Sequence, residues 1–228
     1  MHPSMNAQLA EKTEAPVYNT AKYSLKEELA NTLTHALGTV MGVIGLIAML
    51  TKGWPQLSSI QITGVTLYGA SIILLFLCST LYHGVQSPYL KKQLKVADHC
   101  AIFLLIAGTY TPLVLISLQH ADVNWVLISI WLLALGGIIF KVFFTGRFQW
   151  LSLSLYLLMG WLCMFVVDDL VTSLNQLGFN LLLSGGLLYS LGIIFYVGKK
   201  IPYNHAIWHL FVLGGAFCHF FCIYLAVL

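Results

Sequence analysis

Long apolar segments separated by short polar connections make up most of the chain. A helix that crosses a bilayer needs about 20 mostly apolar residues. Seven windows meet this requirement, at approximately residues 30–51, 60–83, 98–118, 124–144, 149–168, 178–198 and 204–227. The pattern predicts an all-α, polytopic membrane protein: a bundle of seven transmembrane helices over residues 28–228, preceded by a polar N-terminal tail over residues 1–27.

The composition agrees with this fold class. The chain is 59% hydrophobic and 8% charged, whereas soluble domains carry about 25% charged residues. So few charges cannot cover a soluble surface, which excludes a soluble enzyme, a nucleic-acid binder and a disordered regulator. The net charge of +3 is too small to indicate a polyanionic partner. The five cysteines all lie in apolar stretches, so we expect no disulfide framework.

The positive charges predict an orientation. Ten of the eleven Lys and Arg residues fall on one side of the predicted membrane: Lys12, Lys22, Lys26, Lys91, Lys92, Lys95, Lys141, Arg147, Lys199 and Lys200. Lys52 stands alone on the other side. Because cytoplasmic loops are enriched in Lys and Arg, we expect a cytoplasmic N-terminus and a C-terminus outside.

Several polar side chains interrupt the apolar spans, where ionisable groups are costly and mark function by default. In the first span, Glu28, Asn31 and His35 are spaced at i, i+3 and i+7. At about 100° per residue, the three fall within about 60° of one helix face.

Other spans bring further polar residues to the same depth. The second span ends with Ser79 and His83, the third is expected to open at Asp98, and the seventh begins with His205 and His209. Since neighbouring spans run in opposite directions, all of these residues reach the inner leaflet. Interfacial side chains that extend toward headgroups are the alternative, but eight such residues on four helices favour one site.

The histidines favour a metal ion. His205 and His209 are four residues apart, so their side chains project next to each other and can share one ion. With His83 they provide three imidazoles and leave one open position, the arrangement of a catalytic zinc site. The sequence therefore predicts Zn²⁺ bound by His83, His205 and His209.

Asp98 and Ser79 complete the predicted chemistry. Asp98 is suited to take a proton from the reacting water, and Ser79 to orient that water or a developing oxyanion. We expect Glu28, Asn31 and His35 to contact the ligands and hold them in position, with His35 as the alternative ligand.

A histidine in the outer half of the seventh span does not belong to this site. His219 follows His209 by ten residues, about 15 Å along a helix. With Cys218 and Cys222 it could form an outer-leaflet site, but a packed polar residue is the simpler interpretation.

In chain order, these positions resemble the pattern of the progestin and adiponectin receptor family, in its bacterial hemolysin III branch. They read Glu28-x-x-Asn31-x-x-x-His35, Ser79-x-x-x-His83, Asp98 and His205-x-x-x-His209. The strings EELANTLTHALG, STLYHG, DHCAIFLLIAGTYTP and HAIWHLFVLGGAFCHF also fit that branch. The resemblance extends over about residues 24–228.

The resemblance implies a seven-helix bundle in the bacterial inner membrane, with zinc at the positions of His83, His205 and His209 and an aspartate, Asp98, near the reacting water. The motifs are similar to those of alkaline ceramidases, which hydrolyse a lipid amide. For the bacterial branch, the resemblance implies a haemolytic phenotype and a role in membrane-lipid homeostasis.

Several functions follow from these residues. The first is a zinc-dependent hydrolase of a lipid amide or ester at the inner leaflet, with membrane lipids as its partners. The second is a sensor of membrane state in which zinc only joins the helices. A pore-forming cytolysin fits less well, because nothing in the sequence resembles a switch from a soluble to an inserted form. A haem protein is a further alternative, although two histidines one turn apart suit a single small ion better.

Overall fold

The computed structural model describes residues 23–228 as a helical bundle, and this range contains no strand. The predicted tail up to residue 22, with Lys12 and Lys22, lies outside the described residues. The helices are α2 (Leu25–Gly53), α3 (Ser59–Gly84), α4 (Pro88–Pro112), η1 (Leu113–Ser117), α5 (Asn124–Phe144), α6 (Gln149–Gly160), η2 (Leu162–Val166), α7 (Val167–Ser173), α8 (Gln176–Val197), α9 (Asn204–Cys222) and η3 (Ile223–Val227).

Seven helical segments of the described chain are long and apolar enough to cross a membrane. They are Leu25–Gly53, Ser59–Gly84, Pro88–Ser117, Asn124–Phe144, Gln149–Ser173, Gln176–Val197 and Asn204–Val227. The predicted all-α bundle of seven membrane-spanning helices is therefore confirmed, and the chain is a multi-pass membrane protein.

The start of α4 differs from the sequence prediction. The helix begins at Pro88 rather than near residue 98, so Asp98 lies in its third turn and does not open it. The added residues, PYLKKQLKVA, are too polar for a hydropathy window to include. A proline in the first turn suits a helix start, because its missing N–H has no partner to lose there.

The fifth span is broken within the membrane, which the sequence analysis did not predict. Helix α6 ends at Gly160, and the 3₁₀ segment η2 connects it to the short helix α7. The Tyr110 hydroxyl lies 2.9 Å from the Met159 carbonyl oxygen and 3.0 Å from that of Gly160. It also accepts a hydrogen bond from the Cys163 N–H at 2.8 Å. The break is tolerated because Tyr110 bonds backbone groups that lipid cannot satisfy.

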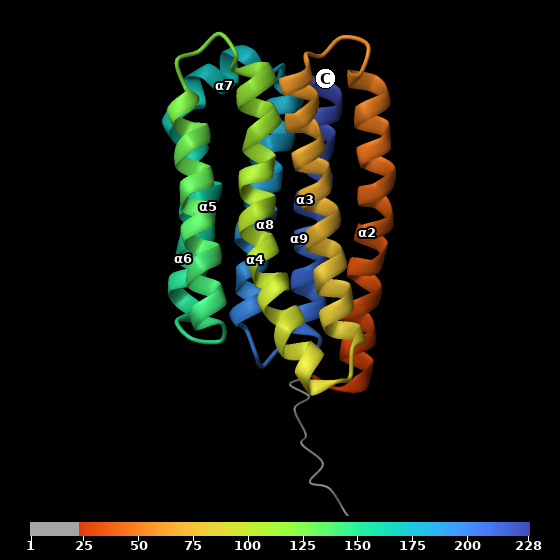
Figure 1. Cartoon of the computed structure of the whole chain (residues 1–228). Coiled ribbons are helices and arrows are strands. Elements are labelled where there is room, and N and C mark those ends of the chain that lie inside the picture. Colours follow the sequence, from red (N-terminus) through yellow and green to blue (C-terminus); the bar gives the residue numbers. More distant parts are fainter. Residues whose placement is uncertain (1–22) are drawn as a thin grey trace, which may run out of the picture.

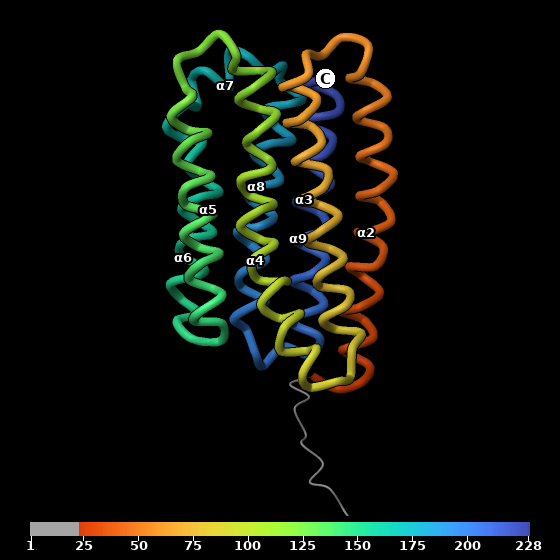
Figure 2. Tube along the Cα trace, in the orientation of Figure 1, coloured from red at the N-terminus to blue at the C-terminus, as the bar shows by residue number. Residues whose placement is uncertain are grey.

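The helices form a compact bundle with α2 at one edge and α5 and α6 at the opposite edge (Figures 1 and 2). Helices α3 and α9 lie beside α2, and α4 and α8 lie between this group and α5–α6. Helix α2 packs against both α3 and α9. Residues from the two ends of the described chain are therefore neighbours.

Small residues bring α2 close to its neighbours. The buried positions of α2 form one stripe, which consists of Asn31, His35, Gly38, Gly42, Gly45, Met49 and Gly53. A Cβ at Gly38 would lie only 2.6 Å from the Phe76 ring on α3. This close approach requires glycine, and it holds the polar residues at the start of the stripe against α3 and α9.

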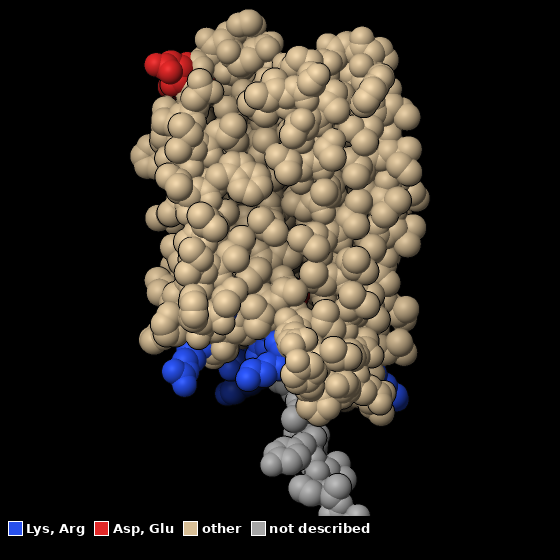
Figure 3. All heavy atoms as spheres, in the orientation of Figure 1, with Lys and Arg blue, Asp and Glu red and all other residues tan. Residues whose placement is uncertain are grey.

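The charged residues separate along the bundle axis. Figure 3 shows Lys and Arg side chains at the end where α2 begins and acidic side chains at the opposite end. We call the end with Lys92, Lys95, Arg147, Lys199 and Lys200 the basic end. The C-terminus lies at the opposite end (Figure 1), where Lys52 donates a hydrogen bond to the Tyr224 carbonyl oxygen at 2.5 Å.

Candidate metal centre

Three histidines from two helices meet at the basic end of the bundle. His83 is in the last turn of α3, and His205 and His209 are in the first two turns of α9. All three are buried, and one ring nitrogen of each lies within 4.8 Å of the others. The three side chains therefore form a group that could hold a metal ion.

The start of α9 is anchored to the helix before it. Tyr203 has a left-handed backbone conformation, with φ of 55°, which ends the α8–α9 connection in a sharp turn. The Asn204 side chain then donates to the Phe195 carbonyl oxygen near the end of α8 at 2.9 Å. This turn determines which side of α9 faces α3 and sets the direction of His205 and His209.

The partners of His83 determine which of its nitrogens faces the other two histidines. Its Nδ1 lies 2.6 Å from a carboxylate oxygen of Glu28, and the other oxygen of Glu28 pairs with Lys91 at 2.7 Å. A carboxylate can only accept a hydrogen bond, so the His83 proton resides on Nδ1. The lone pair of Nε2 then points toward His205. A carboxylate behind a ligating histidine is the usual arrangement around zinc.

His209 is oriented in the same way, by a backbone carbonyl. Its Nδ1 lies 3.1 Å from the Asn31 carbonyl oxygen and 3.2 Å from the Thr34 hydroxyl. The Thr34 hydroxyl itself donates to backbone carbonyl oxygens, so Nδ1 carries the proton here too. Nε2 of His209 is buried and has no hydrogen-bond partner among residues 23–228.

The spacing of one pair of these nitrogens fits a small tetrahedral ion. The Nε2 atoms of His83 and His205 are 3.2 Å apart. Two nitrogens that each lie about 2.0–2.1 Å from a tetrahedral zinc are about 3.3 Å apart. Three imidazoles, with the unsatisfied buried Nε2 of His209 among them, match the ligand set that Zn²⁺ prefers.

His35 takes a different position from the other three. Its ring stacks on the ring of His209, with centroids 3.6 Å apart and an interplanar angle of 9°. It also contacts Phe76 edge-on at 5.0 Å. The group that could hold a metal ion consists of His83, His205 and His209 without His35, and His35 packs on the ring of His209.

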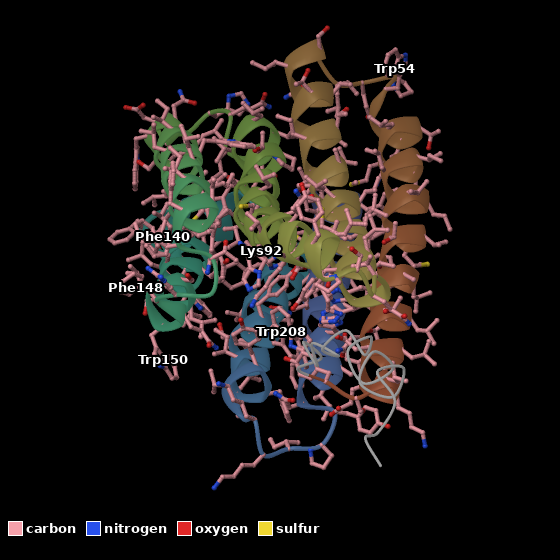
Figure 4. The ribbon with its side chains drawn as sticks, turned by 60° about the horizontal axis from the view of Figure 1, so that its bottom comes forward. Trp54, Lys92, Phe140, Phe148, Trp150 and Trp208 are labelled. Carbon is pink, nitrogen blue, oxygen red and sulfur yellow. The ribbon has the colours of Figure 1, made fainter. Side chains whose placement is uncertain are left out.

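Aromatic residues pack around the histidines from two sides. Trp208, labelled in Figure 4, has its ring centroid 5.1 Å from His205 and 5.5 Å from His209. Tyr23 stacks on His205 at 5.0 Å, and burial raises the pKa of the Tyr23 hydroxyl, which stays neutral. These rings help to bury His205 and His209, and burial strengthens electrostatic interactions inside the site.

Asp98 and Ser79 lie on the neighbouring helices α4 and α3. Both are buried, and the Ser79 side chain faces the Asp98 carboxylate. Asp98 also lies 3.9 Å from the imidazole of His99. The His99 ring is held elsewhere, because its Nδ1 lies 2.6 Å from the Lys95 carbonyl oxygen.

A cavity connects Asp98 to the histidines. It has a volume of about 590 Å³, and its walls include Asp98, His35, His205 and Tyr23. It continues between α4, α6, α8 and α9 along apolar side chains, among them Leu105, Ile106, Leu153, Leu157, Leu182 and Ile193. The site therefore opens onto a space that suits an apolar molecule with a reactive group near Asp98.

The structure brings together the eight residues singled out from the sequence, and it adds contacts that the sequence did not reveal. Tyr23 precedes the Ser24 cap of α2, and the sequence analysis assigned it to the tail. Lys91 served only as an orientation signal, although it pairs with Glu28. The roles of the eight residues as ligands, acid–base group or supports stay predictions.

Comparison with known proteins gives consistent matches. Residues 23–220 match the family model described as Haemolysin-III related. The chain is 46% identical over 205 residues to "Hemolysin-3" of Bacillus cereus, covering 90% of this chain and 93% of the relative. It is 46% identical over 201 residues to "Hemolysin-3 homolog" of Bacillus subtilis, covering 88% and 94%. The human "Monocyte to macrophage differentiation factor" is 32% identical over 227 residues, covering 92% and 88%.

Proposed function

The chain belongs to the Haemolysin-III related family, and on that basis we propose that it is a zinc-dependent hydrolase of a lipid amide or ester. One observation carries the proposal. Three buried histidines each offer a ring nitrogen within 4.8 Å of the other two, next to a cavity shared with a buried carboxylate. A purely structural ion needs neither the cavity nor the carboxylate.

The proposal includes a location and an orientation. The basic end faces the cytoplasm, as positive charge in loops indicates, so the site lies at the inner leaflet of the bacterial plasma (inner) membrane. A lipid reaches it through the cavity without leaving the bilayer. Turnover there would change membrane composition directly, which makes membrane-lipid homeostasis the physiological context.

The ligand set would be His83, His205 and His209. Glu28 and the Asn31 carbonyl hold two of these rings in the tautomer that presents Nε2. A zinc ion bound there supplies a Lewis acid that polarises a carbonyl and makes water a better nucleophile near neutral pH.

Asp98 performs the proton transfer. Its carboxylate accepts a proton from water as the new C–O bond forms at the lipid carbonyl. It then delivers that proton to the departing nitrogen or oxygen as the C–N or C–O bond of the lipid breaks. Ser79 faces Asp98 and orients either the water or the carboxylate. The products are a fatty acid and an amine or alcohol.

Lipid turnover by the purified full chain in lipid nanodiscs tests this function. Zinc-loaded and chelator-treated protein are incubated with acyl lipids that have amide or ester linkages, and released fatty acid is measured by mass spectrometry. We expect release only with zinc, and a loss of about 10²–10⁴-fold in Asp98→Asn. Asp169→Asn, at the opposite end of the bundle, is the matched control and keeps full activity.

One observation favours a second function, a membrane-state sensor with a structural zinc. The three ligands link α3 to α9, and their hydrogen-bond partners add α2. In that case chelation lowers the melting temperature while no lipid is cleaved. No zinc-dependent fatty-acid release by the wild type would refute the hydrolase and leave this second function. Equal release by the wild type and Asp98→Asn would remove Asp98 from the mechanism.

A further inference from the structure

A buried lysine faces the cavity at the basic end of the bundle. Lys141 lies in the last turns of α5, where its exposed fraction is only 3%. It lines the same cavity as Asp98 and His205. An ammonium group in this position is costly, because it loses water inside an otherwise apolar helix.

Two further cations line the same cavity. They are Lys95, on α4, and Arg147, in the connection between α5 and α6. The charges of Lys95 and Lys141 are close enough to act on each other. Within the described chain, none of the three forms an ion pair. Three positive groups therefore line the cavity, and two of them, Lys95 and Lys141, repel each other.

The acidic residues of the described chain do not neutralise these three cations. Glu28 is engaged by His83 and Lys91, and Glu27 caps α2. Asp98 is the one carboxylate of residues 23–228 that lines the cavity; Asp122, Asp168 and Asp169 lie in segments at the opposite end. Three cations against one carboxylate leave a surplus positive charge in this part of the cavity.

Extension of Lys141 to the headgroups does not account for its position. A lysine that only needs water turns its ammonium group outward, away from the helix packing. On α5 the outward positions belong to Val142, Phe143 and Phe144, which are all exposed. Lys141 instead faces inward and lines the cavity, where a bound anion would neutralise it.

The depth of this cationic group indicates where its ligand comes from. Arg147 is followed by Phe148 and Trp150, whose exposed fractions are 61% and 70%. Figure 4 shows both of these side chains at the end of the bundle where α5 and α6 meet. Aromatic side chains of membrane proteins gather at the headgroup level. The entrance beside Arg147 therefore lies at the depth of lipid phosphates, and the apolar walls behind it suit acyl chains.

We propose that Lys95, Lys141 and Arg147 form a phosphate-binding site at the entrance of the cavity, and that its ligand is a phospholipid with acyl chains in the apolar part. Lys and Arg bind phosphate through charge-assisted hydrogen bonds. As a statement about substrate, this inference rests on the proposed function and narrows the class to phosphate-bearing acyl lipids. As a binding site, it does not depend on turnover.

Binding of defined probes to the detergent-purified full chain tests the site. The probes are phosphatidylglycerol, diacylglycerol with the same acyl chains, glycerol 3-phosphate and inorganic phosphate, and dissociation constants are measured by native mass spectrometry. We expect phosphatidylglycerol to bind at least about 10-fold more tightly than diacylglycerol. Lys141→Gln and Arg147→Gln remove this difference. Lys92→Gln, on the exposed side of α4, keeps it and is the matched control.

Each other outcome has a defined meaning. Equal affinity of the wild type for the phospholipid and the diacylglycerol would overturn the inference, as would an unchanged preference in Lys141→Gln. Tight binding of glycerol 3-phosphate or inorganic phosphate, lost in Lys141→Gln, supports the phosphate site and overturns the lipid as its source. Phosphatidylglycerol that binds through these residues but is never cleaved keeps the site and argues against the hydrolase. Cleavage of diacylglycerol without any phospholipid preference supports the hydrolase and overturns the phosphate-binding site.

Discussion

Helix α9 carries histidines in both of its halves, buried near the basic end and half-buried further along, and their surroundings differ. Near the basic end, His205 and His209 meet His83, and each of the three rings presents a nitrogen to the others. Further along the helix, Nε2 of His219 lies 3.1 Å from the Leu182 carbonyl oxygen. Its ring packs on Tyr189 at 5.4 Å, and it is outside the metal-binding group.

The contrast shows what makes a buried histidine a candidate ligand. Packing within a helix does not decide it, because His209 and His219 are in the same helix and both contact neighbouring helices. The number of imidazoles at one depth decides it, together with acceptors such as Glu28 that hold the proton on Nδ1. His219 meets a carbonyl oxygen and a tyrosine ring, so it fills space and makes one hydrogen bond.

The largest effect is expected from removing a ligand at the basic end. His205→Ala leaves two imidazoles, too few for a stable tetrahedral zinc site. We expect its zinc affinity to fall by more than the 10–100-fold that loss of a supporting contact costs. Competition with a chromophoric chelator measures the affinity. Zinc binding as tight as in the wild type would remove His205 from the ligand set.

A smaller loss is expected from the residue behind His83. Glu28→Gln keeps the size of the side chain but weakens the contact that fixes the His83 proton, so zinc affinity should fall by about 10–100-fold. Glu27→Gln is the matched control, because glutamine also serves in a capping box. The same chelator competition applies, and equal affinities in the two variants would contradict a supporting role for Glu28.

At the His219 end we expect a loss of stability without a loss of metal. A Cβ at Gly185 would lie 2.2 Å from the His219 ring, so Gly185→Ala forces the ring or the helices to shift. Overpacking of this kind costs about 1–3 kcal/mol. Thermal unfolding followed by fluorescence should show a lower melting temperature at unchanged zinc content. Gly136→Ala, where a Cβ meets nothing within 4 Å, is the control; an equal shift in both variants would refute the packing argument.

The smallest effect is expected from His219 itself. His219→Gln keeps a donor for the Leu182 carbonyl oxygen but loses the ring contact with Tyr189. We expect a destabilisation of about 1 kcal/mol, the size of one ordinary hydrogen bond, with zinc affinity as in the wild type. Thermal unfolding and chelator competition on the same sample check both values. A large drop in zinc affinity would mean that the two halves of α9 are not independent.

Much of this arrangement can be predicted from the sequence. Hydropathy gives the seven spans, and the depth of each polar residue follows from alternating span direction. The i, i+4 spacing of His205 and His209 then favours one shared ion. The position of Asp98 within its helix was misjudged, because the polar first turns of α4 lie outside the apolar window. The break at Gly160 was missed, because a hydropathy window reports the apolar character of side chains and not the conformation of the backbone.

Other features depend on packing between helices and need the structure. The Nδ1 contacts that orient the rings of His83 and His209 arise from α2, which is distant in sequence from both. Lys141 was counted only as an orientation charge. Its burial and its place in the cavity follow from how α5 packs against α4, which spacing along α5 does not reveal.

The most direct test of the metal centre is the zinc content of the purified full chain, measured by mass spectrometry in the wild type, His83→Ala, His209→Ala and His219→Gln. The account predicts about one zinc per chain in the wild type and in His219→Gln, and close to none in His83→Ala and His209→Ala. No zinc in the wild type, or zinc that persists in His83→Ala and His209→Ala, would contradict it.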